Sequence, residues 1–110
     1  MSNRIQADPA PEDIGAVSPA LEHYTQSRLF GELWKRPDLS PRDRIMVTLA
    51  ALIARNQTVQ MAYYVNLALD TGVQQAEISE IITHLAFYAG WPPAMTALQI
   101  ARKVFDEEEK

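Results

Sequence analysis

The sequence predicts an all-α protein, a single-domain bundle of about five to six helices. Apolar residues recur at three- and four-residue intervals along most of the chain, and no segment shows the alternation of a half-buried strand. Ser18-Pro19 and Ser40-Pro41 each place a capping serine before a proline at the first helical position. With 110 residues, the chain is long enough for one hydrophobic core.

The segment before Ser18 is expected to form an extended or disordered arm. Residues 1–17 combine prolines with acidic residues and contain few apolar side chains. The helical domain is therefore expected over residues 18–110. Its first helix is expected to run from Pro19 to about Trp34, and Gly31 weakens it because glycine loses the most backbone freedom in a helix.

The second helix is expected over Pro41–Ala54. Ser40 can cap it, while Asp43 completes a variant of the capping box and lies near the positive end of the helix dipole. Residues 45–53 are nearly all apolar, so the helix has apolar groups on almost every side. Such a helix is expected in the middle of a bundle.

Three further helices are expected in the second half of the chain. The third begins at a cap provided by Asn56 or Thr58 and runs to about Asp70, with Gly72 as a left-handed residue at its end. The fourth covers about residues 75–89, and the fifth runs from residue 92 or 93 through residue 105. Residues 107–109 are glutamates at a helix C-terminus, where the dipole disfavours negative charge, so this end is expected to fray.

Composition excludes several classes of function. A net charge of -4 and a pI near 5.0 argue against a sequence-independent nucleic-acid binder. The absence of cysteine excludes disulfides, thiolate metal sites and thiol catalysis. The sequence shows neither a signal peptide nor an apolar run long enough to cross a bilayer, so a cytoplasmic protein without a membrane partner is expected.

The amount of apolar helix surface indicates self-association. Several predicted helices are apolar on more than one face, which is more than a chain of this length can bury alone. A homo-oligomer that buries these faces between subunits is the prediction. The alternative is a compact monomer with an apolar surface.

His84 is the first candidate for chemistry. Glu80 lies one helical turn before it and can orient its ring or raise its pKa, which would suit a general acid or base near neutral pH. The alternative is a partly buried histidine whose ring is satisfied by a carboxylate or a backbone carbonyl. No metal site is predicted, because His23, the other histidine, belongs to a different helix.

Tyrosines and arginines supply the other candidates. Tyr63, Tyr64 and Tyr88 can donate hydrogen bonds into a pocket, although tyrosines at helical spacing also cap a core with the hydroxyl in water. Arg44 precedes the apolar run of the second helix and can bind a carboxylate with two hydrogen bonds. The chain has no phosphate loop, nucleophile elbow or dinucleotide fingerprint, so no cofactor is expected.

Three segments carry a resemblance: residues 29–34, residues 39–52 and residues 84–92. They are similar to the carboxymuconolactone decarboxylase family, and the similarity extends over about residues 21–105. The last segment, from His84 to Pro92, is the most specific. The resemblance implies the all-helical fold that this family shares with the alkylhydroperoxidase D-like proteins, and a homo-oligomer, commonly a trimer or hexamer.

The resemblance also limits the reaction. The peroxidase branch uses two cysteines, a histidine and a glutamate, and the equivalent positions here are Gln57, Gln60, Tyr64 and Ile45, so a thiol peroxidase is excluded. The decarboxylase branch usually has a glutamate-leucine pair and a histidine where this chain has Gln60, Met61 and Tyr64. The arginine and the second histidine of that branch are present as Arg44 and His84.

Carried over, the resemblance implies a cofactor-free lyase that decarboxylates or isomerises a small carboxylated lactone or a similar compact substrate. His84 would deliver a proton or stabilise an oxyanion, and Tyr64 would take the place of the missing histidine. Arg44 and Arg42 would bind a substrate carboxylate, and Tyr88 and Trp91 would form walls of the pocket. The alternative function is a non-catalytic oligomeric member that binds a small molecule.

Overall fold

The structure is a computed structural model that describes the backbone of residues 11–109 and the side chains of residues 14–109. Every described element is helical, which confirms the all-α prediction. The elements in order are α1 (Pro11–Val17), α2 (Pro19–Tyr24), the π-helical turn η2 (Thr25–Phe30), the 3-10 turn η3 (Leu33–Lys35), α3 (Pro41–Ala54), α4 (Met61–Thr71), α5 (Gln75–Tyr88) and α6 (Trp91–Glu108).

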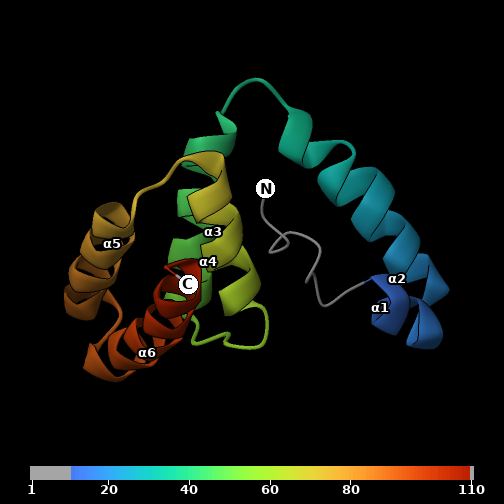
Figure 1. Ribbon diagram of the computed structural model, residues 1–110. Coiled ribbons are helices and arrows are strands. Elements are labelled where there is room, and N and C mark those ends of the chain that lie inside the picture. The colour runs from blue at the N-terminus through green and yellow to red at the C-terminus, as the bar shows by residue number, and fades with distance from the viewer. Residues whose placement is uncertain (1–10, 110) are drawn as a thin grey trace.

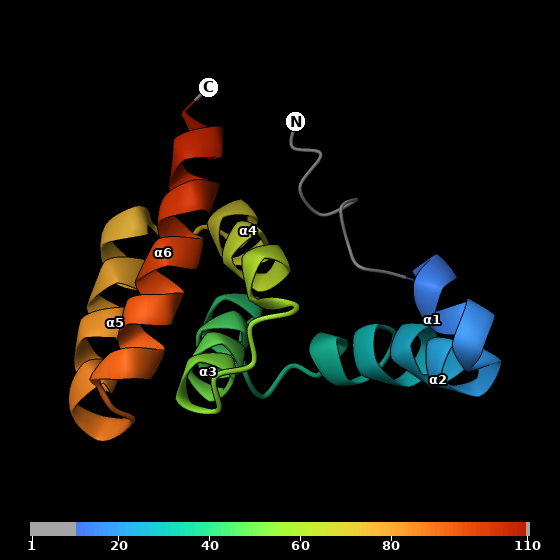
Figure 2. The same cartoon turned by 90° about the horizontal axis from the view of Figure 1, so that it is seen from below.

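The described chain consists of a four-helix bundle and an arm. Helices α3 to α6 pack together, whereas η3, η2 and α2 project away from them and α1 turns against α2 at the far end (Figure 1). Figure 2 shows from a second direction that the arm, defined here as residues 11–35, joins the bundle through the linker of residues 36–40. The backbone of the arm approaches the bundle most closely where η3 meets α3.

Helix α3 contacts every other helix of the bundle, as α6 also does, but it buries one face only. Its apolar sequence predicts burial on almost every side, and within the single chain this is wrong, because Val47 on another face is 60% exposed. The helix packs against α4, α5 and α6, and its residues Ile45 and Leu49 are fully buried. Ile53 extends the same buried stripe, at the four-residue spacing of one helix face. The other helices complete the core with Met61, Tyr64, Val65, Ala68, Val73, Ile78, Ile82, Ala86, Ala94, Ala97, Ala101 and Val104.

The predicted helix ends agree with the structure in three places. The hydroxyl of Ser18 accepts a hydrogen bond from the backbone N–H of Leu21 at 3.2 Å, and that of Ser40 accepts one from Asp43 at 3.0 Å. Gly72 ends α4 in the left-handed region, with φ of 108°. These signals are local, so they act in the same way before and after the chain folds.

The first predicted helix is wrong as a single element, because the α-helix that starts at Pro19 ends at Tyr24. The hydroxyls of Thr25 and Ser27 donate at 2.8 Å to the carbonyls of the residues four positions earlier, and such bonds compete with the backbone ladder. The chain continues as the π-helical turn η2, leaves the helical backbone angles at Glu32 and resumes as the 3-10 turn at Leu33.

Other boundaries also differ from the prediction. Residues 11–17 form α1 rather than an extended segment, while residues 1–10 of the predicted arm lie outside the described chain. Helix α4 begins at Met61, so neither Asn56 nor Thr58 caps it; Asn56 instead has a positive φ of 55° after the end of α3. Helix α6 continues to Glu108 despite its acidic end.

Large apolar side chains remain exposed at the corner between α5 and α6. Phe87 is 75% exposed and Tyr88 is 79% exposed, and Trp91, Met95 and Leu98 continue this apolar surface along α6. We call these five residues the α5–α6 corner. None of the described helices has the length and apolar character needed to cross a membrane.

The buried face of α3 leads to a stability prediction. Leu49→Ala should lower the free energy of unfolding by about 3 kcal/mol, because it leaves a cavity in a fully packed site. Val47→Ala, on the same helix but at a side chain that is 60% exposed, should cost less than about 0.5 kcal/mol. Urea unfolding followed by circular dichroism measures both changes, and equal losses would contradict the described core.

Candidate active site

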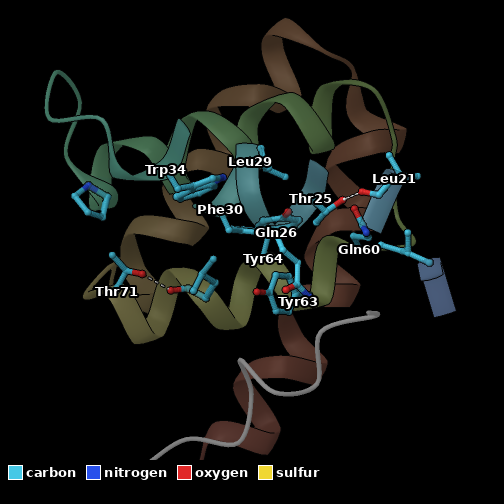
Figure 3. A pocket seen from close by; sticks show the side chains of 13 residues that line it. Leu21, Thr25, Gln26, Leu29, Phe30, Trp34, Gln60, Tyr63, Tyr64 and Thr71 are labelled. Carbon is cyan, nitrogen blue, oxygen red and sulfur yellow. Dashed lines mark hydrogen bonds between the residues drawn. The ribbon is translucent and has the colours of Figure 1, made fainter. Parts of the chain in front are cut away.

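A cavity of about 640 Å³ lies between the arm and α4. Its lining comes from both sides of this gap, as Figure 3 shows for most of the side chains. We call it the arm–α4 cavity. The arm contributes Ile14, Leu21, Thr25, Gln26, Leu29, Phe30 and Trp34, and the remaining lining residues are Pro41, Gln60, Tyr63, Tyr64, Leu67 and Thr71.

Helix α4 places its contribution on one face. Gln60, Tyr64, Leu67 and Thr71 follow at intervals of four, three and four residues, which is the spacing of a single helix face. Tyr64 is 8% exposed and Tyr63 is half-buried, and their rings meet edge to face with centroids 4.9 Å apart. The two phenols therefore form a fixed aromatic wall with polar tips.

The arm supplies an opposite wall that is mostly apolar. The rings of Phe30 and Trp34 stack with centroids 6.0 Å apart, and both side chains pack against the core of the bundle. The hydroxyl of Thr25 donates to the carbonyl of Leu21 at 2.8 Å, so its proton is used within the helix. Gln26 adds a carboxamide to this wall.

These groups suit a compact ligand that makes hydrogen bonds. The polar groups on the described lining are carboxamides, phenols and hydroxyls, set among aromatic and aliphatic side chains. Carboxamides donate and accept hydrogen bonds, and a phenol can also donate a proton. Such a cavity can orient a ligand by hydrogen bonds.

His84 lies elsewhere, in a groove of about 420 Å³ between α3 and α5. Met46 and Ala50 form its α3 side, and the α5 side includes Glu77 and Glu80. The ring of His84 is exposed and stacks on Tyr88, with centroids 4.8 Å apart and planes 21° from parallel. His84 is therefore a surface histidine of the single chain, and not the partly buried one that was the alternative.

Arg42 is engaged with a carboxylate of the chain itself. Its guanidinium pairs with Glu77, which joins the start of α3 to the start of α5. Glu77 also accepts a hydrogen bond from the backbone N–H of Gln74 at 2.9 Å. That backbone hydrogen bond, together with the bond from Arg42, lowers the pKa of Glu77 below its ordinary value of 4.5.

The guanidinium of Arg44 binds backbone carbonyls of the preceding linker and does not line either of the two pockets described above. One terminal nitrogen, Nη2, donates to the carbonyl of Arg36 at 3.1 Å and to that of Leu39 at 3.3 Å. Its Nε is buried and has no hydrogen-bond partner among the described residues. Arg44 lines neither the arm–α4 cavity nor the groove of His84.

Tyr88 and Trp91, the predicted pocket walls, belong to the exposed α5–α6 corner, where Trp91 is 58% exposed and meets the ring of Phe87 edge to face. Within one chain, Tyr64 is thus separated from the other five predicted site residues. Their proposed roles stay predictions. In the described part of the chain, no three His, Asp or Glu side chains are grouped so that they could hold a metal ion.

The sequence interpretation did not include the arm among the site residues. The pattern in the sequence that could have indicated the arm is the spacing of Gln26, Phe30 and Trp34. These residues recur every four positions and would share one face of a regular helix. The same spacing is equally typical of side chains that pack into a core. Only its position opposite α4 shows that it forms one wall of a cavity.

Comparison with known proteins identifies similar sequences. The model of the carboxymuconolactone decarboxylase family matches residues 19–103. A 4-carboxymuconolactone decarboxylase of Acinetobacter baylyi is 28% identical over 96 residues, which is 87% of this chain and 72% of the relative. An uncharacterised 15.0 kDa protein from the nqo9-nqo10 intergenic region of Paracoccus denitrificans is 28% identical, over 86% of this chain and 84% of its own length.

A third relative is the nitrosuccinic acid decarboxylase of Metarhizium robertsii. It is 28% identical over 78 residues, which is 71% of this chain. The chain spans about half of that protein, 54% of its length.

The geometry of Glu77 predicts a pH-dependent contribution to stability. Because folding lowers the pKa of Glu77 below 4.5, its ionised form stabilises the fold above that pH, and this stabilisation is lost as the pH falls through the folded-state pKa. Glu77→Gln should therefore lower the melting temperature at pH 7 and reduce its decline between about pH 5 and pH 3. Thermal unfolding across this range provides the measurement.

Glu80→Gln is the matched control for Glu77. Glu80 is an exposed carboxylate on the same helix and forms no ion pair with the described residues. The pH dependence of this variant should follow the parent. If the two variants showed the same pH dependence, the contacts of Glu77 would not be its cause.

Proposed function

Because the chain belongs to the carboxymuconolactone decarboxylase family, we propose that it is a cofactor-free lyase of the decarboxylase type. Its substrate would be a small carboxylated lactone or a similarly compact compound. The observation that carries the proposal is Tyr64, a buried phenol on the wall of the arm–α4 cavity. The decarboxylases among the relatives, one for 4-carboxymuconolactone and one for nitrosuccinic acid, support the class of reaction.

The proposed reaction is chemically complete without a cofactor. The bond between the ring carbon and the carboxylate breaks, and the carboxylate leaves as CO2. Its electron pair passes through the conjugated double bond into the lactone carbonyl, and a proton is then added at a remote carbon. A carboxylate among apolar walls loses its hydration, whereas the delocalised charge of the transition state depends less on water, so such a site favours loss of CO2.

The lining supports a division of roles. Tyr64 would donate a hydrogen bond to the lactone oxygen that gains charge, and would supply the proton in place of the histidine usual in this branch. The carboxamides of Gln26 and Gln60 would orient the ring through hydrogen bonds. Phe30 and Trp34 would cover its faces and exclude water.

We extend the proposal to a homo-oligomer, a trimer or hexamer, which buries the α5–α6 corner between subunits. The support is the exposure of Phe87, Tyr88 and Trp91 on one surface. Assembly would also give a role to His84, which stacks on Tyr88 beside that surface. Within an oligomer, His84 would be close to a substrate only if a second copy brought its own arm–α4 cavity there.

A second candidate function is ligand binding without turnover. It is favoured by Gln60 and Tyr64, which replace the glutamate and histidine expected from the resemblance. A carboxamide cannot exchange a proton near neutral pH as these residues do. In this case the arm–α4 cavity would bind the same class of compound and leave it unchanged.

Turnover of γ-carboxymuconolactone, followed by ultraviolet absorbance, tests the proposal. Tyr64→Phe should lower kcat by about 100-fold, because it removes the acid and the hydrogen bond and leaves the ring in place. Tyr24→Phe is the matched control, since Tyr24 is a 56% exposed tyrosine of the arm outside the cavity. It should retain the parental rate.

His84→Ala separates the remaining possibilities. Turnover that is lost in His84→Ala and kept in Tyr64→Phe would move the reaction to the groove between α3 and α5. Binding without turnover, measured by calorimetry on folded protein, would replace the lyase proposal with the binding function. Absence of both binding and turnover would remove this substrate.

A further inference from the structure

We infer that Arg44 is a positioning residue, which fixes the angle between the arm and the bundle by binding the backbone carbonyls of the linker. The inference rests on the proposed function only in taking the arm–α4 cavity as the substrate site. It differs from the role that the sequence suggests, in which Arg44 binds a substrate carboxylate. The geometry assigns the Nη2 donor of Arg44 to the carbonyls of Arg36 and Leu39.

The position of these carbonyls explains why the contact matters. They lie near the two ends of the linker of residues 36–40, which is the covalent connection between the arm and α3. A guanidinium presents several donors in one rigid plane, so it can bind two carbonyls at once and fix their separation. Arg44 itself is anchored in the first turn of α3, beside the fully buried Ile45.

Besides this contact, the described part of the arm is held to the bundle by the side chains of Phe30 and Trp34, which pack against the core near the linker. The closest backbone approach of the arm to the bundle is between η3 and α3, next to the linker, and the rest of the arm projects away (Figures 1 and 2). From Lys35 to Leu21 the arm spans roughly 20 Å at the rise of a helix. A rotation of about 10° at the linker would thus move Leu21 by about 3 Å.

A displacement of that size would change the cavity. The arm supplies seven of its thirteen lining residues, Trp34 and Phe30 near the linker and Leu21 farther away. A ligand in van der Waals contact with both walls loses much of that contact when one wall moves by an ångström or more. The contact of Arg44 with the linker therefore acts on the site from outside it.

The first measurement follows the arm without any ligand. In a Trp91→Phe background, Trp34 is the only tryptophan of the chain, and it is half-buried on the arm side of the cavity. Arg44→Met, which keeps much of the volume of the side chain and removes its donors, should raise the quenching of Trp34 fluorescence by acrylamide. Arg28→Met is the matched control, because it removes an exposed arginine of the arm that pairs with Glu32. Its quenching should equal that of the background protein.

The second measurement separates positioning from direct binding. The probes are coumalate, the carboxylate of an unsaturated six-membered lactone, and its uncharged methyl ester, both titrated by calorimetry. If Arg44 positions the arm, Arg44→Met should weaken both probes to the same extent, by about tenfold. If Arg44 instead binds the carboxylate, the variant should weaken coumalate alone, and this result would overturn the inference.

Unchanged quenching of Trp34 in Arg44→Met would overturn it as well. Circular dichroism checks that the variant is folded, and Arg44→Lys carries the test if it is not. The ammonium group of lysine can reach one carbonyl but cannot span two. Quenching of Trp34 in Arg44→Lys that lies between the values of the parent and of Arg44→Met supports the inference. Quenching in Arg44→Lys equal to that of the parent refutes it. If the parent binds neither probe, the proposed substrate site is wrong, while the quenching series still decides the role of Arg44.

Discussion

The structure depends on the first turn of α3, where two arginines connect this helix to α5 and to the linker before it. Ile45 and Leu49 hold α3 in the bundle because their side chains have no contact with solvent. Ser40 caps the same turn. From this fixed position Arg42 reaches Glu77 at the start of α5, and Arg44 reaches the linker to the arm. Both arginines can fix the position of their partners because the helix that carries them is itself held in place by the burial of apolar surface.

The arm–α4 cavity is a consequence of this arrangement, since its walls belong to units that are joined at one end. Helix α4 is part of the bundle, and Tyr64 is fixed there by its burial. The arm is held by the stacked Phe30 and Trp34, by η3 and by the linker. Because the walls are separate, the shape of the cavity depends on the angle between them as well as on the side chains that line it.

The arginines also show that a side chain expected to bind a substrate can already have partners within its own chain. A guanidinium near the start of an apolar helix is well suited to bind a substrate carboxylate. It is equally suited to a carboxylate or carbonyl of its own chain, and the folded chain offers such groups at high effective concentration. Arg42 therefore pairs with Glu77, and Arg44 binds the carbonyl of Leu39. His84, by contrast, faces an open groove beside the exposed α5–α6 corner, so its role depends on what covers that surface.

The sequence by itself determined the all-α class and the helix ends at Ser18, Ser40 and Gly72, because periodicity and caps act between residues a few positions apart. It did not determine where the helix after Pro19 breaks, since hydroxyl groups compete there with the backbone for the same carbonyls. Only the tertiary structure decided that Tyr64 faces the arm and that His84 lies in a separate groove. Those positions depend on the angles at which helices pack and on a linker whose direction Arg44 helps to set, and neither is encoded in the residues near Tyr64 or His84 along the chain.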